Sequence, residues 1–166
     1  MKDNRKMIAA LSASLILIVA IVSLGGCDIP GVSMDGNLTA KVTSVKSTSG
    51  SAEYLVDGRR ETKWSADASD GRQYAELVFS EDVTFDTIVI DESGDSVSGF
   101  EIYMPKEENV LDGWVQIYKG TVLGKTNGEM AKISLPEPIT ANALKIVITK
   151  SDGRFSLREI GIYLTE

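Results

Sequence analysis

Residues 73–79, QYAELVF, and 84–90, TFDTIVI, alternate apolar and polar side chains and are rich in Val, Ile, Phe and Tyr. Alternation with a period of two is typical of a β-strand that buries one face. The same pattern recurs, between Gly, Asp, Asn or Pro residues, at 99–104, 114–119, 130–135, 143–149 and 159–164, and more weakly at 39–45. A helical turn is predicted only for residues 51–56, with Ser51 as its cap. The sequence therefore predicts an all-β domain over residues 38–166, an antiparallel sandwich or barrel.

Composition excludes several kinds of chemistry. The chain has 166 residues, no His and a single Cys. Without His there is no His-dependent catalytic triad, imidazole base or His-ligated zinc site. A single Cys allows neither an intrachain disulfide nor a thiolate zinc cluster.

The N-terminal segment has the pattern of a targeting sequence. Residues 1–6 hold three basic side chains and one acidic one, and residues 7–24 carry no charge. A basic stretch followed by an apolar stretch is typical of a signal peptide. Residues 24–27, LGGC, resemble the lipobox of bacterial lipoproteins.

This resemblance implies cleavage after residue 26 and acylation of Cys27, which makes residues 1–26 a lipoprotein signal peptide. Residues 27–37 would then form the acylated start and a flexible stalk, because Pro30, Gly31 and Gly36 interrupt any periodicity. The alternative is an uncleaved transmembrane anchor, since 18 residues of helix span about 27 Å. Both alternatives place the domain on the extracytoplasmic face of the cell membrane, and the first anchors it there by lipid.

The charge balance argues against a nucleic-acid partner. Without residues 1–26, which hold three basic residues and one acidic residue, 14 basic and 23 acidic residues remain, a formal charge of −9. Binding to phosphate backbones needs clustered Lys and Arg. No such cluster is visible along the sequence.

Six segments, in order, resemble the discoidin or F5/8 type C domain. They are LVDGRRETKWS at 55–65, YAELVF at 74–79, DVTFDTIVI at 82–90, SGFEIY at 98–103, PITANALKI at 138–146 and REIGIY at 158–163. The resemblance is strongest to the galactose-binding-like, carbohydrate-binding modules appended to bacterial glycosidases, including α-L-fucosidases. It implies an eight-stranded antiparallel β-sandwich of jelly-roll type.

The family resemblance also implies a structural calcium ion between the first loop and the last strand. Its predicted ligands are the Asp57 and Glu159 carboxylates, the Thr62 hydroxyl and carbonyl, and the carbonyls of Tyr54, Arg59 and Arg158. Such an all-oxygen shell with two negative charges suits Ca²⁺. The alternative is that Asp57 and Gly58 form an ordinary turn and that Glu159 is a solvated strand residue.

Ligand recognition in this family is expected on loops at one end of the sandwich. The predicted contacts are Phe155 and Arg154, in a loop between the last two strands, and Arg72. An aromatic face with neighbouring polar groups is the usual requirement for binding sugars. The alternative has Phe155 packed under the loop and both arginines paired with carboxylates. Trp64 is predicted in the core, and Trp114 at the core or the sandwich edge.

Three functions are compatible with these observations. The first is a membrane-tethered lipoprotein whose domain binds carbohydrate without catalysis. The second is a structural lipoprotein that docks a protein partner in an envelope or surface assembly. A glycosidase with two catalytic carboxylates is the third, but the resemblance assigns no such pair, so we predict that the chain is not an enzyme.

Overall fold

A computed structural model describes residues 36–94, 96–106, 113–121 and 130–165. The strands are β1 (Val42–Ser47), β2 (Trp64–Asp67), β3 (Gln73–Glu92), β4 (Val97–Pro105), β5 (Trp114–Gly120), β6 (Ala131–Ser151) and β7 (Arg154–Tyr163). Three short 3₁₀ helices accompany them, η1 (Leu38–Lys41), η2 (Ala52–Val56) and η3 (Ala68–Asp70). The predicted signal peptide, Cys27 and nearly all of the predicted stalk lie outside the described residues.

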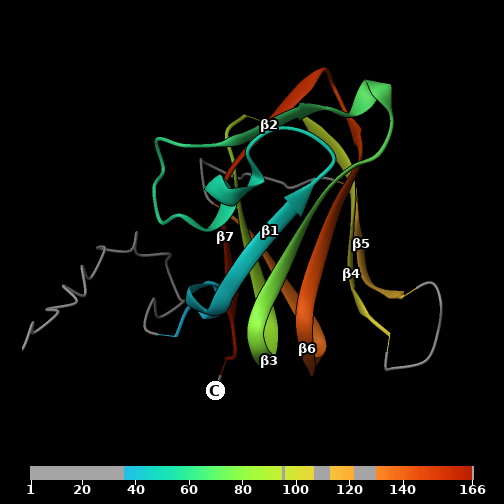
Figure 1. Ribbon diagram of the computed structural model, residues 1–166. Coiled ribbons are helices and arrows are strands. Elements are labelled where there is room, and N and C mark those ends of the chain that lie inside the picture. Colours follow the sequence, from blue (N-terminus) through green and yellow to red (C-terminus); the bar gives the residue numbers. More distant parts are fainter. Residues whose placement is uncertain (1–35, 95, 107–112, 122–129, 166) are drawn as a thin grey trace, which may run out of the picture.

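The strands pair in the order β2-β7-β3-β6-β4-β5, with β1 also on β3, and every pair is antiparallel. The two long strands belong to both layers of a sandwich, because the β3–β6 register shifts between Val78 and Val83. One layer, called here the larger layer, contains β1, residues 73–78 of β3, residues 143–151 of β6, β4 and β5. The other contains β2, β7 and the remaining halves of β3 and β6. Figure 1 shows β1, β3 and β6 side by side in front of β7.

This arrangement confirms the predicted all-β antiparallel sandwich and corrects its strand count. The described residues form seven strands, not eight. The predicted segments 73–79 and 84–90 are one continuous strand, and so are 130–135 and 143–149, because the backbone stays extended through the bend between them. In addition, β2 forms at residues 64–67, where no strand was predicted.

The core lies between the layers and contains the predicted inward-facing side chains. Large side chains that are fully buried include Trp64, Phe85, Phe155, Leu144 and Ile146. Ile117 of β5, in the alternating segment 114–119, is only partly buried against this core. Trp64 is therefore a core residue, as predicted, and its indole N–H donates to the Ser49 carbonyl at 2.7 Å.

The predicted helical turn forms as η2, whose Ala52 and Leu55 side chains are buried. Ser51 is the N-cap residue of η2, as predicted, but its side chain makes no capping hydrogen bond. The turn is held by its backbone, with the Tyr54 N–H donating to the Ser51 carbonyl at 3.3 Å. Among the described residues, no helix is long and apolar enough to cross a membrane.

The chain enters the sandwich at the end opposite the β6–β7 turn. Asn37, predicted as the last stalk residue, accepts hydrogen bonds from Thr39 N at 3.1 Å and from Ile162 N at 3.1 Å. The side chain of Asn37 thus fixes η1 against the end of β7. In Figure 1, η1 lies at the lower left and the β6–β7 turn lies at the top.

Candidate functional site

The loop after η2 closes onto β7 and brings together most of the predicted calcium ligands. The Thr62 hydroxyl lies 2.8 Å from Asp57 Oδ2 and 2.8 Å from the Arg59 carbonyl oxygen. Asp57 Oδ1 accepts a hydrogen bond from Arg59 N at 2.9 Å. Gly58, with φ of 72°, donates its N–H to Glu159 Oε1 at 3.3 Å. A positive φ favours glycine, so Gly58 lets the loop turn toward the strand.

Glu159 is the residue that distinguishes this loop from an ordinary turn. Its Oε2 atom is buried and has no hydrogen-bond partner among the described residues. Burial raises the pKa of Glu159 from its ordinary 4.5 to about 7; the Gly58 N–H opposes this, and the negative charges of Asp57 and Asp91 add to it. A buried carboxylate oxygen without a partner costs free energy unless a cation or donor satisfies it. The residues present therefore fit a bound cation.

An ion-pair network beside the loop was not predicted from the sequence. Asp91 in β3 is 2% exposed and accepts from Arg60 through Nε at 3.1 Å and Nη2 at 3.0 Å. It also accepts from Arg158 Nη1 at 3.2 Å. The network ties the loop to β3 and β7. In the sequence Asp91 directly follows an apolar strand and resembles the start of a turn, so no local signal marks it as buried.

The other predicted ligands have less direct support. The Tyr54 side chain is exposed on η2, which contacts β7. The Arg158 side chain donates a hydrogen bond to Asp91. This contact does not bear on the predicted calcium ligand, which is the backbone carbonyl of Arg158. The described residues contain no group of three or more His, Cys, Asp or Glu side chains suited to a metal. The calcium prediction requires only two carboxylates, supplemented by hydroxyl and carbonyl oxygens.

The predicted ligand contact at Phe155 is wrong. Phe155 lies in β7, paired with Ala66 of β2, because the turn before it contains only Asp152 and Gly153. Its side chain is fully buried, and its ring meets the Trp64 ring edge-on at a centroid distance of 5.0 Å. The inward parity of β7 thus makes Phe155 a core residue, in agreement with the alternative stated above.

The two arginines predicted with Phe155 have different surroundings. Arg154 is exposed opposite Asp67 in the β2–β7 pair. The pKa of Asp67 is lowered by hydrogen bonds from Ser69, and the charge of Arg154 contributes to the lowering. Arg72 instead pairs with Glu101 of β4 and donates to the Tyr103 hydroxyl at 3.1 Å. The three predicted residues therefore do not form one sugar site, because Phe155 faces inward and Arg72 contacts the larger layer.

The sequence model of the F5/8 type C domain family matches residues 39–160 of this chain. The chain belongs to the F5/8 type C domain family. A comparison with curated protein sequences finds no match.

Several solved structures share the fold of this F5/8 type C domain. SpGH29 is similar over 80% of this chain, with 22% identity and a TM-score of 0.65, and this chain spans 28% of that protein. The family 32 carbohydrate-binding module of NanJ from C. perfringens, solved in complex with galactose, matches 75% of this chain and 95% of its own, with 19% identity and a TM-score of 0.61. The family 32 module of AlyQ, solved with 4,5-unsaturated mannuronic acid, matches 75% and 96%, with 20% identity and a TM-score of 0.62.

The donor set of the F5/8 type C domain limits what its loop can bind. Asp57 and Glu159 offer carboxylate oxygens, Thr62 a hydroxyl and Arg59 a carbonyl, and three of these four groups are already in hydrogen-bond contact with one another. Hard cations such as Ca²⁺ prefer oxygen ligands of this kind, whereas softer transition metals favour nitrogen and sulfur. The donor chemistry of Asp57 and Glu159 therefore fits a hard cation and does not fit a transition metal.

Proposed function

We propose that the chain is a lipid-anchored, extracytoplasmic lipoprotein whose F5/8 type C domain binds carbohydrate without catalysis. The observation that carries this proposal is the family match over residues 39–160, together with a fold shared by modules solved in complex with galactose and with an unsaturated mannuronic acid. The binding domain occupies most of the chain. It would act by holding a glycan at the cell surface rather than by cleaving it.

Binding is tested on the full-length chain, purified in detergent, by glycan-array screening followed by calorimetry, with calcium and with chelator. We expect saturable binding to at least one class of glycan. No binding to plant, host or bacterial glycans, combined with capture of one defined envelope protein, would replace this proposal with the docking function.

Anchoring is proposed to occur through Cys27, the single cysteine of the chain. Two or three acyl chains bind a bilayer stably, because each buried CH₂ contributes about 0.8 kcal/mol. Cells grown with an alkyne-tagged palmitate should label the wild-type chain and not Cys27→Ser. The mass of the intact protein distinguishes the two anchors, since cleavage removes residues 1–26 and a transmembrane anchor retains them.

We also propose that the loop at Asp57 and Glu159 holds a structural Ca²⁺. The unpartnered Oε2 of Glu159 and the neighbouring Asp57 carboxylate support this assignment. Asp57→Asn keeps the oxygen that accepts from Arg59 N and removes one negative charge. We expect it to abolish most of the increase in melting temperature that calcium gives the wild type.

A matched control is available in the same domain. Asp67 accepts from Ser69 N at 2.9 Å, the same two-residue-ahead contact that Asp57 makes with Arg59. Asp67→Asn should therefore change local turn stability alone and leave the calcium response intact. Equal calcium responses in the two variants would rule out Asp57 as a ligand.

A further inference from the structure

The outer surface of the larger layer carries a cluster of charged side chains in which cations outnumber carboxylates. Lys46 Nζ and Lys145 Nζ lie 3.7 Å and 3.3 Å from the two carboxylate oxygens of Glu76. Lys119 Nζ lies 3.5 Å from Glu101, which also pairs with Arg72. These six side chains have a formal excess of two positive charges, in a chain whose formal net charge is −7. We call this surface the cationic face.

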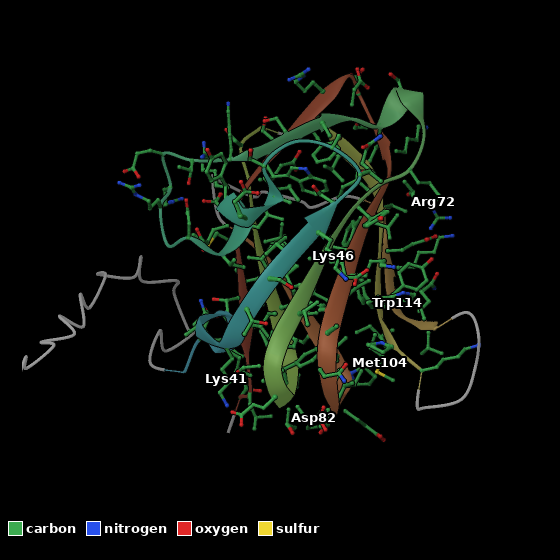
Figure 2. The ribbon with its side chains drawn as sticks, in the orientation of Figure 1. Lys41, Lys46, Arg72, Asp82, Met104 and Trp114 are labelled. Atoms are coloured by element: carbon green, nitrogen blue, oxygen red, sulfur yellow. The ribbon has the colours of Figure 1, made fainter. Side chains whose placement is uncertain are left out.

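Strand register places five of these six side chains together, and Arg72, in the turn just before β3, joins them through its ion pair with Glu101. Lys46 is opposite Glu76, Glu76 is opposite Lys145, and Lys145 is opposite Tyr103 across β1, β3, β6 and β4. In the adjacent row Glu101 is opposite Lys119 of β5. The positions of the charges that lie in strands are thus fixed by the sheet. Figure 2 shows Lys46 and Trp114 on either side of β6, with Arg72 above Trp114.

Two groups on the cationic face are held in one arrangement. Lys145 is 17% exposed, with its ammonium 3.8 Å from the Trp114 ring centroid and 5.1 Å from that of Tyr74. Glu101 is nearly buried and accepts from the Tyr103 hydroxyl at 2.6 Å. That hydrogen bond lowers the pKa of Glu101 against the effect of burial, and the charge of Arg72 lowers it further. Glu101 therefore stays ionised and keeps Arg72 and Lys119 in place.

We propose that the cationic face binds an acidic polysaccharide, one whose sugar units carry carboxylates. Arg72, Lys46 and Lys119 are the exposed cations that would contact these carboxylates, and guanidinium and ammonium groups form strong charge-assisted hydrogen bonds with them. The half-buried Trp114 and Tyr74 rings add apolar surface for sugar C–H groups. The face crosses the strands from β1 to β5, about 19 Å at the usual strand spacing, which suits an extended polymer better than a single sugar.

This inference rests on the proposed carbohydrate binding and assigns it both a ligand class and a location. It moves recognition from the turn at Arg154 and Phe155 to the outer surface of a sheet, and it keeps Arg72 among the contacts. Charge complementarity favours an acidic glycan over a neutral one, because the rest of the domain is acidic and repels anions while this face attracts them.

The test compares two charge-matched double variants of the full-length chain in detergent. Lys46→Gln with Lys119→Gln removes two exposed cations, and both carboxylates keep a partner, Lys145 for Glu76 and Arg72 for Glu101. The control, Lys41→Gln with Lys132→Gln, changes the net charge equally at other positions: Lys41 pairs with Glu81, and Lys132 is exposed opposite Val89. Polygalacturonate is the acidic probe, its fully methyl-esterified form the neutral one and poly-L-glutamate the non-sugar polyanion.

We expect the wild type and the control variant to bind polygalacturonate with equal affinity. The Lys46/Lys119 variant should bind it about tenfold more weakly, because it loses two exposed ion pairs with carboxylates of the polymer. Binding should also weaken as salt rises. Equal loss in both double variants, or poly-L-glutamate binding as tightly as polygalacturonate, would overturn the proposal. Binding of neutral glycans alone would refute the acidic-glycan inference and leave the proposed function standing, whereas no glycan binding would refute both.

Discussion

Replacing Glu159 by Gln tests whether the buried carboxylate is built for a cation. The substitution keeps the size of the side chain and removes its charge. In chelator the wild-type protein must hold this group with one oxygen 3.3 Å from Gly58 N and the other without a partner. The neutral form is favoured there, because burial raises the pKa of Glu159 from 4.5 to about 7. We therefore expect Glu159→Gln to stabilise the metal-free protein at alkaline pH.

The pH dependence follows from where the proton is bound. Between pH 4.5 and about 7, the folded state holds the Glu159 proton more tightly than the unfolded state does, so stability falls as pH rises. The full shift corresponds to about 3 kcal/mol. Since solvent reaches part of the side chain, screening reduces this to about 1–2 kcal/mol. The Glu159→Gln variant does not lose stability in this way. The free energies of unfolding of the two proteins should therefore be equal near pH 5 and differ by about 1–2 kcal/mol at pH 8.

Thermal unfolding at pH 5, 6, 7 and 8, in chelator and in calcium, measures the effect. In chelator at pH 8 the variant should melt about 3–6 °C above the wild type. In calcium the order should reverse, because only the ionised carboxylate can bind the ion. Glu53→Gln, at an exposed position of η2, is the control and should change neither curve. A Glu159→Gln protein less stable than wild type in chelator at every pH would refute the reasoning.

Three further substitutions test the packing that supports the site. Phe155→Ala should cost about 3–5 kcal/mol in urea unfolding, because it empties a fully buried position against Trp64; a loss below 1 kcal/mol would contradict its place in the core. Arg60→Ala should cost about 1–3 kcal/mol, since Asp91 keeps Arg158 and loses a partner that contacts it through two nitrogens; chemical denaturation at low and high salt would measure this, and an unchanged midpoint would refute it. Gly153→Ala should cost about 1–2 kcal/mol from backbone strain alone, because φ is 70° and an added Cβ meets nothing within 4 Å; a Tm equal to wild type would show that the turn adopts another conformation.

Much of the fold could be predicted because β-strand parity is a local property of the sequence. Leu77 and Phe79 occupy the buried positions that alternation predicted. The number of strands could not be predicted in this way. Whether residues 80–82 end a strand or merely bend it depends on partners in β6, which are far away in the sequence. Phe155 was misplaced for a related reason, since the length of the β6–β7 turn depends on how far both strands continue to pair.

The candidate sites differ in how visible they are in the sequence, and the difference has a physical origin. The contact between Asp57 and Thr62 is local, because the two residues lie five apart and fit one turn, whereas Glu159 reaches this turn from β7. Their proposed role as ion ligands came from the family resemblance and not from the residue pattern alone. The cationic face has no such local signal. Glu76 and Lys145 are both polar residues in alternating strands, which is the ordinary pattern of solvent-facing positions. Their contact exists because β3 and β6 pair in one register, and a one-residue slip would turn Lys145 away from both Glu76 and Trp114. Recognition by a sheet surface is therefore encoded in strand pairing, which residue patterns along the chain do not reveal.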